Sequence, residues 1–183
     1  MRLIDEPTAA ATAAGFHLIA DRKNVLVFDF GGVTLDISIL CCYDGELEIK
    51  STNCERNLGG RDIDEALVEY CIKEFQEEKN IDLSESKEAR KRLAIECERV
   101  KIILSEQHSA EALVASIVVN DEEEVYEDLE VSISRDTLES ELEQFNERLE
   151  ACLEKVIDSA QMEKDEIDKI LLVGGSSRIP KIK

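Results

Sequence analysis

Three Gly-Gly pairs constrain most strongly what this chain can fold into, because each adjoins a segment with a clear structural pattern. Gly31-Gly32 lies between two strand-like segments, Gly59-Gly60 leads into a helical stretch, and Gly174-Gly175 follows a short apolar strand. Glycine lets the backbone turn tightly and approach a ligand closely, since it carries no Cβ. Backbone N–H groups at such turns can face a phosphate. These positions are therefore the first candidates for an anion site.

The first pair lies within a succession of predicted strands. Asn24 to Phe30 is almost continuously apolar, which is typical of a strand buried on both faces. Leu35 to Leu40 alternates between apolar and polar side chains, and the turn signal Asp44-Gly45 followed by Glu46 to Thr52 predicts a hairpin. Upstream, Pro7 to Gly15 is rich in alanine and favours a short helix. We expect three strands in quick succession, the last two antiparallel.

Helices and a small sheet are predicted in the middle of the chain. Ile63 to Cys71 and Leu93 to Leu104 carry apolar side chains at helical spacing. Glu111 to Val119 and Glu127 to Ile133 have strand character, and we expect the acidic stretch at 121–124 to be a solvated turn between them. The middle of the chain therefore predicts an α+β arrangement.

The two ends of the chain are expected to form one larger unit. A single long helix is predicted from Leu138 to Val156, and Lys169 to Val173 predicts a buried strand that leads into a final helix. The fold class is therefore predicted to be α/β. Its base subdomain comprises residues 1–58 and 142–183, and a smaller α+β subdomain is inserted at residues 59–141.

Composition narrows the function classes. With 42 acidic and 22 basic residues, the net charge is −20. This charge argues against nucleic acid and against anionic membrane surfaces as partners, because both are polyanions. The acidity is interpreted as a solvated surface, with docking of basic partners as the alternative. No apolar run reaches the length of about 20 residues that spans a bilayer.

The cysteines favour a reducing compartment. No C-x-x-C pair occurs and only two histidines are available, so a zinc site is disfavoured. Cys71, Cys97 and Cys152 fall on apolar helical stripes, where a free thiol behaves as a small hydrophobe. We therefore expect the cytoplasm.

The segment Asp29 to Asp36 is the first motif that could carry chemistry. Its glycines could cradle a phosphate, and Asp29 could hold Mg²⁺ through water, because that ion prefers oxygen ligands and keeps several waters. The same letters fit a plain hairpin turn in which the aspartates cap strand ends. Taken alone, the motif leaves both interpretations open.

The other motifs are weaker when considered singly. Gly59-Gly60 at a helix start could bind an anion, although acidic residues in the first turn also complement the helix dipole. Val173 to Pro180 has the strand, turn and helix order that cradles nucleotides in α/β folds. Glu98, Lys101 and Ser105 share one helix face and could contact a ribose and a base, or simply form a polar surface.

Taken together and in this order, the motifs resemble the second half of the nucleotide-binding domain of the seventy-kilodalton heat-shock protein family. The resemblance covers essentially the whole chain. Asp5 to Ala11 resembles N-E-P-T-A-A-A, Asp29 to Asp36 resembles D-L-G-G-G-T-F-D, Leu58 to Asp64 resembles L-G-G-E-D-F-D, Glu98 to Ser105 resembles the helix that contacts adenosine, and Val173 to Lys181 resembles V-G-G-S-T-R-I-P-K.

The resemblance implies a lobe of an actin-like ATPase, of ribonuclease H-like fold, whose nucleotide cleft lies between two lobes. It implies that Glu6 and Asp29 help to arrange Mg²⁺ and the attacking water. Nucleotide contacts are implied for Gly31, Gly32, Thr34, Gly60, Glu98, Lys101, Ser105, Gly174, Gly175, Ser176 and Arg178. The expected cofactors are ATP or ADP with Mg²⁺, and the expected partners are nucleotide-exchange factors and co-chaperones. Because some members of the resembled family live in the lumen of the endoplasmic reticulum, that lumen is the alternative to the cytoplasm.

Two departures from the family pattern weaken the expected nucleotide binding. Val33 stands where the family has its third glycine, and a β-branched residue adopts positive φ only at a cost. Ile102 stands where the family usually has an arginine that stacks on adenine, and an aliphatic chain supplies no such cation. Arg61 replaces an acidic residue, which is a lesser change.

The resulting hypothesis is a fragment of an ATP-dependent chaperone for protein folding and the stress response. The fragment is expected not to hydrolyse ATP by itself, because the family's first phosphate loop and catalytic lysine are expected to precede residue 1. The alternative is a lobe of a pseudo-ATPase that works through protein–protein contacts. Another actin-like enzyme, such as a sugar kinase, is disfavoured by the matches at Glu6 to Ala11 and Val173 to Pro180.

Overall fold

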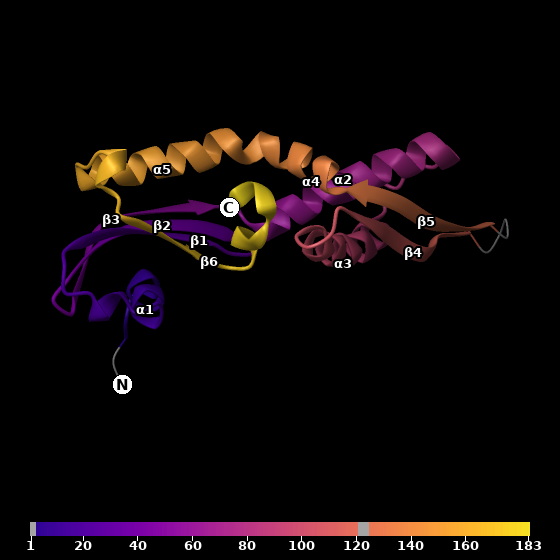
Figure 1. The fold of residues 1–183 in the computed structure, drawn as a ribbon. Helices are drawn as coiled ribbons and strands as arrows, with labels where there is room; N and C mark the ends of the chain where they lie inside the picture. The colour runs from indigo at the N-terminus through magenta and orange to yellow at the C-terminus, as the bar shows by residue number, and fades with distance from the viewer. Residues whose placement is uncertain (1–2, 121–124) are drawn as a thin grey trace. The chain divides into compact units, whose positions relative to one another are not determined.

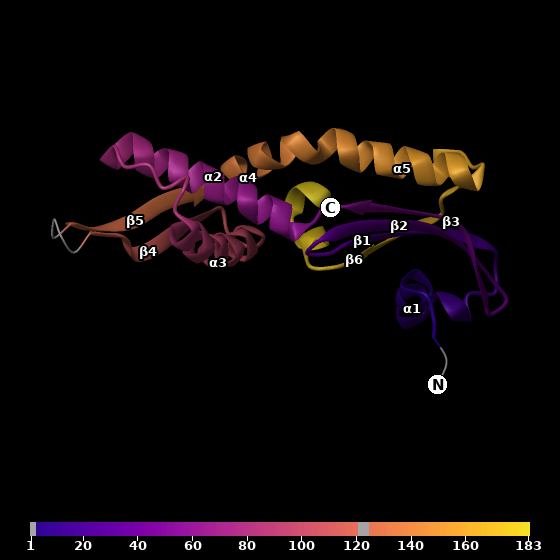
Figure 2. The ribbon, with the colours of Figure 1, turned by 180° about the vertical axis from the view of Figure 1, so that it is seen from behind.

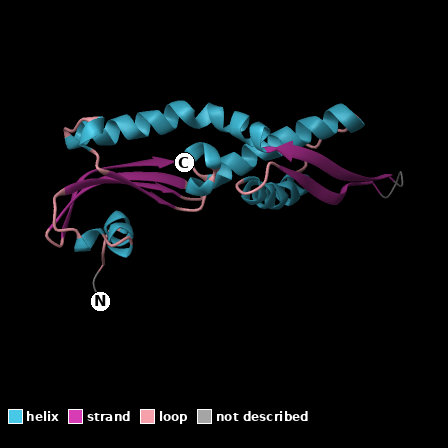
Figure 3. Cartoon of the chain, in the orientation of Figure 1, coloured by secondary structure: helices cyan, strands magenta, loops and turns pink. Residues whose placement is uncertain are grey.

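A computed structural model describes residues 3–120 and 125–183 of the chain, which divide into two compact units (Figures 1 and 3). Unit 1 comprises Met1–Gly60 and Phe145–Arg178, and unit 2 comprises Arg61–Gln144 and Ile179–Lys183. The sequence placed the subdomain borders two to three residues earlier, and it grouped the last five residues with the base subdomain. The base-and-insertion organisation itself stays a prediction. Each unit is described by itself below.

Unit 1 is built on a four-stranded sheet in the order β3-β2-β1-β6. The strands are β1 (Lys23–Phe30), β2 (Thr34–Tyr43), β3 (Glu46–Arg56) and β6 (Lys169–Val173). The first three pair antiparallel, whereas β6 runs parallel to β1. The predicted hairpin is confirmed, and its turn residues Asp44 and Gly45 both adopt positive φ.

Helices cover both faces of this sheet, with α1 on one side and α5 on the other (Figures 1 and 2). Helix α1 (Glu6–Ala13) packs through Ala11 on a buried cluster that includes Val25 and Leu40. Helix α5 (Asn146–Ala160) packs on β2 and β3, where the Ser51 hydroxyl donates to the Val156 carbonyl over 2.7 Å. As predicted, β1 is buried on both faces.

The single long helix predicted from Leu138 to Val156 is wrong in its continuity. The chain forms α4 (Arg135–Leu142), a 3₁₀ turn and then α5. At the break, the Gln144 side-chain amide donates to the Glu141 carbonyl over 2.9 Å. This side-chain bond competes for a carbonyl that a regular helix pairs with a backbone N–H, so it favours the tighter turn.

The prediction of a buried strand β6 is also wrong. Strand β6 lies at the sheet edge, and its Ile170 and Leu172 side chains are 65% and 39% exposed. The predicted final helix is replaced by 3₁₀ turns at Ser176–Arg178 and Pro180–Ile182. Between them Ile179 is extended, as expected of a residue that precedes proline.

Unit 2 combines helices α2 (Gly60–Lys79), α3 (Lys87–Leu104) and α4 with the hairpin of β4 (Ser109–Asn120) and β5 (Val125–Ser134). The predicted apolar stripe of α3 is confirmed, because Leu93, Cys97, Val100 and Leu104 are all fully buried. The acidic turn predicted at 121–124 lies outside the described residues. Within the described part of the chain, no helix is both long and apolar enough to cross a membrane.

Side chains of α3 form hydrogen bonds with backbone groups at the outer edge of β4. Glu96 accepts the Leu113 amide over 2.9 Å, and Arg99 donates to the Glu111 carbonyl over 2.6 Å. Arg92 donates to the Ser116 carbonyl at a bulge where Ser116 has positive φ. A helix that caps an open strand edge in this way prevents further strand pairing there.

Candidate functional site

The three Gly-Gly turns meet within unit 1 around one carbonyl group. The Gly31 carbonyl accepts the Gly60 amide over 3.0 Å and the Ser176 hydroxyl over 2.9 Å. The turn after β1, the start of α2 and the turn after β6 are thereby joined. Sequence segments up to 145 residues apart thus form one surface. The positions of the motifs in the sequence did not by themselves establish this.

Two of the glycines are required by close packing of the backbone. A Cβ at Gly59 would lie 2.5 Å from the Val33 nitrogen. A Cβ at Gly174 would lie 2.3 Å from the Phe30 carbonyl oxygen and 2.7 Å from Asp29 Oδ1, and Gly174 also has a φ of +83°. No side chain fits at either position, so the glycines draw the turns together.

The other glycines differ in what they offer a ligand. A Cβ at Gly32 or at Gly175 would meet nothing within 4 Å, so both positions face open space. The Gly31 amide, in contrast, donates to the Thr34 carbonyl over 3.0 Å, and the Gly60 amide is already committed to Gly31. Gly32 and Gly175 are therefore the positions at which a bound group can approach the backbone.

Carboxylates gather beside these turns. Asp29 and Asp36 lie opposite each other in the β1–β2 register, and the carboxyl of Glu6 lies close enough to Asp29 to affect its pKa. Burial raises the pKa of Asp29, and the neighbouring charges of Glu6 and Asp36 raise it further. The two residues predicted to be catalytic are thus brought together, and Asp36 joins them.

The acidic group fits a hydrated cation better than a directly bound one. Among the described residues, no three His, Cys, Asp or Glu side chains are placed to hold a metal ion. Mg²⁺ usually keeps several waters and binds few side chains. Asp29, next to Gly174 and flanked by Glu6, is suited to such water-mediated contact.

The remaining predicted residues of unit 1 have mixed roles. Ser176 is buried and its hydroxyl holds the Gly31 carbonyl, so it positions the turn. Arg178 is exposed and its amide donates to the Gly175 carbonyl over 3.2 Å. Thr34 begins β2 and closes the turn through its own carbonyl.

The predicted helix face lies in unit 2, on α3. Lys101 Nζ is 2.7 Å from Asp64 Oδ1, and both side chains are only 11% exposed. Glu98 and Asp64 line a hollow of about 280 Å³ between α2 and α3. Ser105 caps the C-terminal end of α3, where its hydroxyl donates to the Lys101 carbonyl over 3.2 Å. Burial raises the pKa of Asp64, although Lys101 opposes the shift.

Three residues of these sites were not among the predicted ones. Asp36 could have been found from its place opposite Asp29 in a hairpin register. Asp64 is four residues into α2, and nothing in the sequence spacing identifies it as the partner of Lys101. Gly59 belongs to a recognised pair, but nothing in the sequence indicates that a Cβ there would collide with the Val33 backbone.

The two departures from the family pattern are both exposed. The Val33 side chain is 46% exposed, and Ile102 is 60% exposed. Positive φ occurs at several of the described residues, but Val33 is not one of them. The expected backbone strain at Val33 is therefore not found, and its effect is confined to added apolar bulk at the turn.

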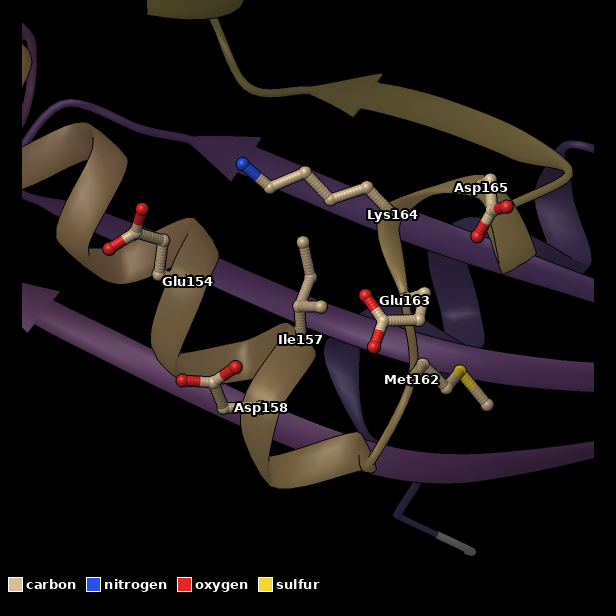
Figure 4. Close-up of a pocket in the computed structure, with 7 residues that line it drawn as sticks. All are labelled: Glu154, Ile157, Asp158, Met162, Glu163, Lys164 and Asp165. Carbon is tan, nitrogen blue, oxygen red and sulfur yellow. The ribbon is translucent and has the colours of Figure 1, made fainter.

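A further hollow, of about 650 Å³, lies at the C-terminal end of α5 (Figure 4). Ile157 lies between the acidic side chains of α5 and the loop residues Glu163 and Lys164. None of the predicted site residues lines it. The larger hollow is therefore separate from the glycine turns.

Comparison with protein families agrees with this geometry. The family model described as Hsp70 protein matches residues 1–183, the full length of the chain. The chain belongs to the Hsp70 family. The mixed sheet with helices on both faces agrees with the actin-like ATPase fold of Hsp70 proteins, so the predicted family and fold class are confirmed. Hsp70 chaperones in general bind ATP or ADP with Mg²⁺ and interact with co-chaperones.

Proposed function

We propose that the glycine turns of unit 1 form the phosphate-binding part of an ATP/ADP site in an Hsp70 chaperone. The observation that carries this proposal is the convergence of three Gly-Gly turns on the Gly31 carbonyl. Gly32 and Gly175 leave open backbone for phosphate oxygens. Asp29 and Glu6 arrange hydrated Mg²⁺ and the attacking water.

The adenosine contacts are proposed for α3 of unit 2. Glu98 beside its hollow offers a carboxylate acceptor for ribose hydroxyls. The aliphatic stem of Lys101 and the Ser105 hydroxyl complete the predicted face, while the Lys101 ammonium stays paired with Asp64. Exposed Ile102 offers the base an apolar surface in place of a cation.

Membership of the Hsp70 family supports a proposal for the wider role. The site serves a cycle of protein folding in which co-chaperones and nucleotide-exchange factors act on the chaperone. This chain alone binds nucleotide weakly and does not hydrolyse ATP, because phosphoryl transfer needs charge stabilisation from several sides of the phosphate.

Nuclear magnetic resonance of the ¹⁵N-labelled chain tests the proposal with the two halves of the ligand. Magnesium pyrophosphate should shift the amide signals of Gly32, Gly175 and their neighbours. Adenosine should shift signals of Glu98 to Ser105 and leave the glycine amides unchanged. Mg²⁺ alone is the control for the carboxylates at Asp29. Pyrophosphate shifts that avoid all three glycine turns would contradict the proposal.

A pseudo-ATPase that works through protein–protein contacts is the second candidate. The exposed apolar side chains of Val33 and Ile102, at the two parts of the proposed site, favour it. Val33→Gly and Ile102→Arg discriminate between the candidates. A gain in Mg-ADP affinity of about tenfold or more for either variant indicates that the native residues have suppressed nucleotide binding. Unchanged affinity removes the reason for this candidate.

A further inference from the structure

A pair of buried thiols lies between α2 and α3 in unit 2, and neither thiol is part of the proposed nucleotide site. The sulfur atoms of Cys71 and Cys97 lie 4.0 Å apart, and both side chains are fully buried. The two residues are 26 positions apart in the sequence, so their contact is created by the fold. A disulfide bond is about 2.05 Å long, so the two sulfur atoms have to approach each other by about 2 Å to form one.

The other four cysteines lack this arrangement. Cys41 and Cys42 are adjacent on β2, where successive side chains point to opposite faces of the sheet. Cys152 is buried on α5, and Cys54 is exposed on β3. Among the described residues, the sulfur–sulfur contact is confined to Cys71 and Cys97. The described residues therefore contain one geometrically defined dithiol.

The closed fold keeps this dithiol unreactive. The neighbouring Cys71 sulfur and burial both raise the pKa of Cys97 far above that of a free thiol. Only the thiolate attacks other sulfur atoms, so reaction requires a transient opening that separates α2 from α3 and admits solvent. The same opening breaks the Asp64–Lys101 ion pair between these helices.

We infer that Cys71 and Cys97 are a disulfide-forming site, oxidised by low-molecular-weight disulfides such as oxidised glutathione. One protein thiol loses its proton and attacks the small disulfide, expelling one small thiolate. The second protein thiol loses its proton and attacks the mixed disulfide, expelling the other. Two protein thiols are oxidised to one disulfide, and one small disulfide is reduced to two thiols that carry the two protons.

The bond would fasten α2 to α3 at the place where the two sulfur atoms already face each other. It closes a loop of 26 positions, which restricts the unfolded chain and so stabilises unit 2. A reducing cytosol keeps the pair as thiols, whereas an oxidising lumen favours the disulfide. The pair does not depend on the proposed nucleotide site, so the two proposals fail or succeed separately.

Disulfide mapping of the complete chain tests this inference. The chain is incubated with oxidised glutathione, with and without a urea concentration below the unfolding transition, then alkylated, digested and analysed by mass spectrometry. The expected product is one cross-linked peptide pair that contains Cys71 and Cys97, formed faster in urea. Recovery of both residues as alkylated thiols, or cross-links that join other cysteines, would overturn the inference.

Stability gives a second readout. Oxidised wild-type chain should unfold at a higher urea concentration than reduced chain, and the difference should vanish in Cys71→Ala. Cys152→Ala removes another buried thiol and should keep the difference. A lower midpoint for the oxidised wild type would contradict the inference. Should Cys71→Ala fail to fold, the wild-type mapping and midpoint still decide it.

Discussion

The Gly60 amide donates to the Gly31 carbonyl oxygen over 3.0 Å and joins the start of α2 to the turn after β1. The Ser176 hydroxyl reaches the same oxygen from the turn after β6. One carbonyl thus holds three segments that the sequence separates widely. The turns are assembled by contacts within the protein, so a phosphate would meet a surface that is already formed.

Gly174→Ala should destabilise the chain by at least about 2 kcal/mol, because alanine is strained at positive φ and its Cβ would meet the Phe30 backbone. Gly175→Ala is the matched control. Gly175 has neither constraint, so the free energy of unfolding of Gly175→Ala should stay within about 0.5 kcal/mol of wild type. Urea denaturation measures both. Equal losses for the two variants would contradict the described packing.

Asp29→Asn should stabilise the chain near neutral pH. The pKa of Asp29 is raised in the folded state, so between the unfolded and folded pKa values the folded state binds more protons than the unfolded one. Stability therefore falls as pH rises through the folded pKa. The advantage of the variant should disappear below the ordinary value of 3.8.

Asp82→Asn is the control for Asp29→Asn, because the pKa of Asp82 is shifted in the opposite direction. The Asp82 carboxylate accepts the Ser84 amide over 2.8 Å, which lowers its pKa. Its ionised form stabilises the fold above the ordinary carboxyl pKa, so this variant should lose stability near neutral pH and match wild type in acid. Denaturation from pH 3 to 8 compares the two. Parallel curves for both variants would refute the assignment.

Lys101→Met should destabilise the chain by about 3–5 kcal/mol, since it leaves the buried Asp64 carboxylate without its cation. Replacing both partners, Asp64→Leu with Lys101→Met, should recover most of the loss. Lys73→Met is the control, because the Lys73–Glu77 pair is exposed and worth less than about 1 kcal/mol. Thermal unfolding of wild type, the single variants and the double variant measures the coupling between Asp64 and Lys101. A double variant no more stable than Lys101→Met would contradict a pairwise role.

The sequence predicted local structure well where one pattern dominated. The continuous apolar run at Asn24 to Phe30 gave a buried strand, and the stripe from Leu93 to Leu104 gave a buried helix face. The sequence predictions failed where the exposure of an element depends on its position in the tertiary structure. The letters of β6 are as apolar as those of β1, but β6 lies at the sheet edge and is exposed.

In the candidate site too, the sequence identified the residue types but not the contacts that depend on tertiary packing. Motif letters identified the glycines and the acidic residues, because these residue types have special backbone freedom or charge. They could not distinguish Gly59 and Gly174, which packing requires, from Gly32 and Gly175, which face open space. Nor could they show that Lys101 is paired with Asp64, because that contact joins two helices.

The Mg-ADP affinity of Gly32→Leu and Gly175→Leu tests the central claim most directly. A Cβ at either position would meet nothing within 4 Å, so the fold should tolerate both variants and their urea midpoints should stay close to that of wild type. If phosphates approach the backbone there, the leucine side chains should weaken Mg-ADP binding about tenfold or more. Unchanged affinity in both folded variants would contradict the account.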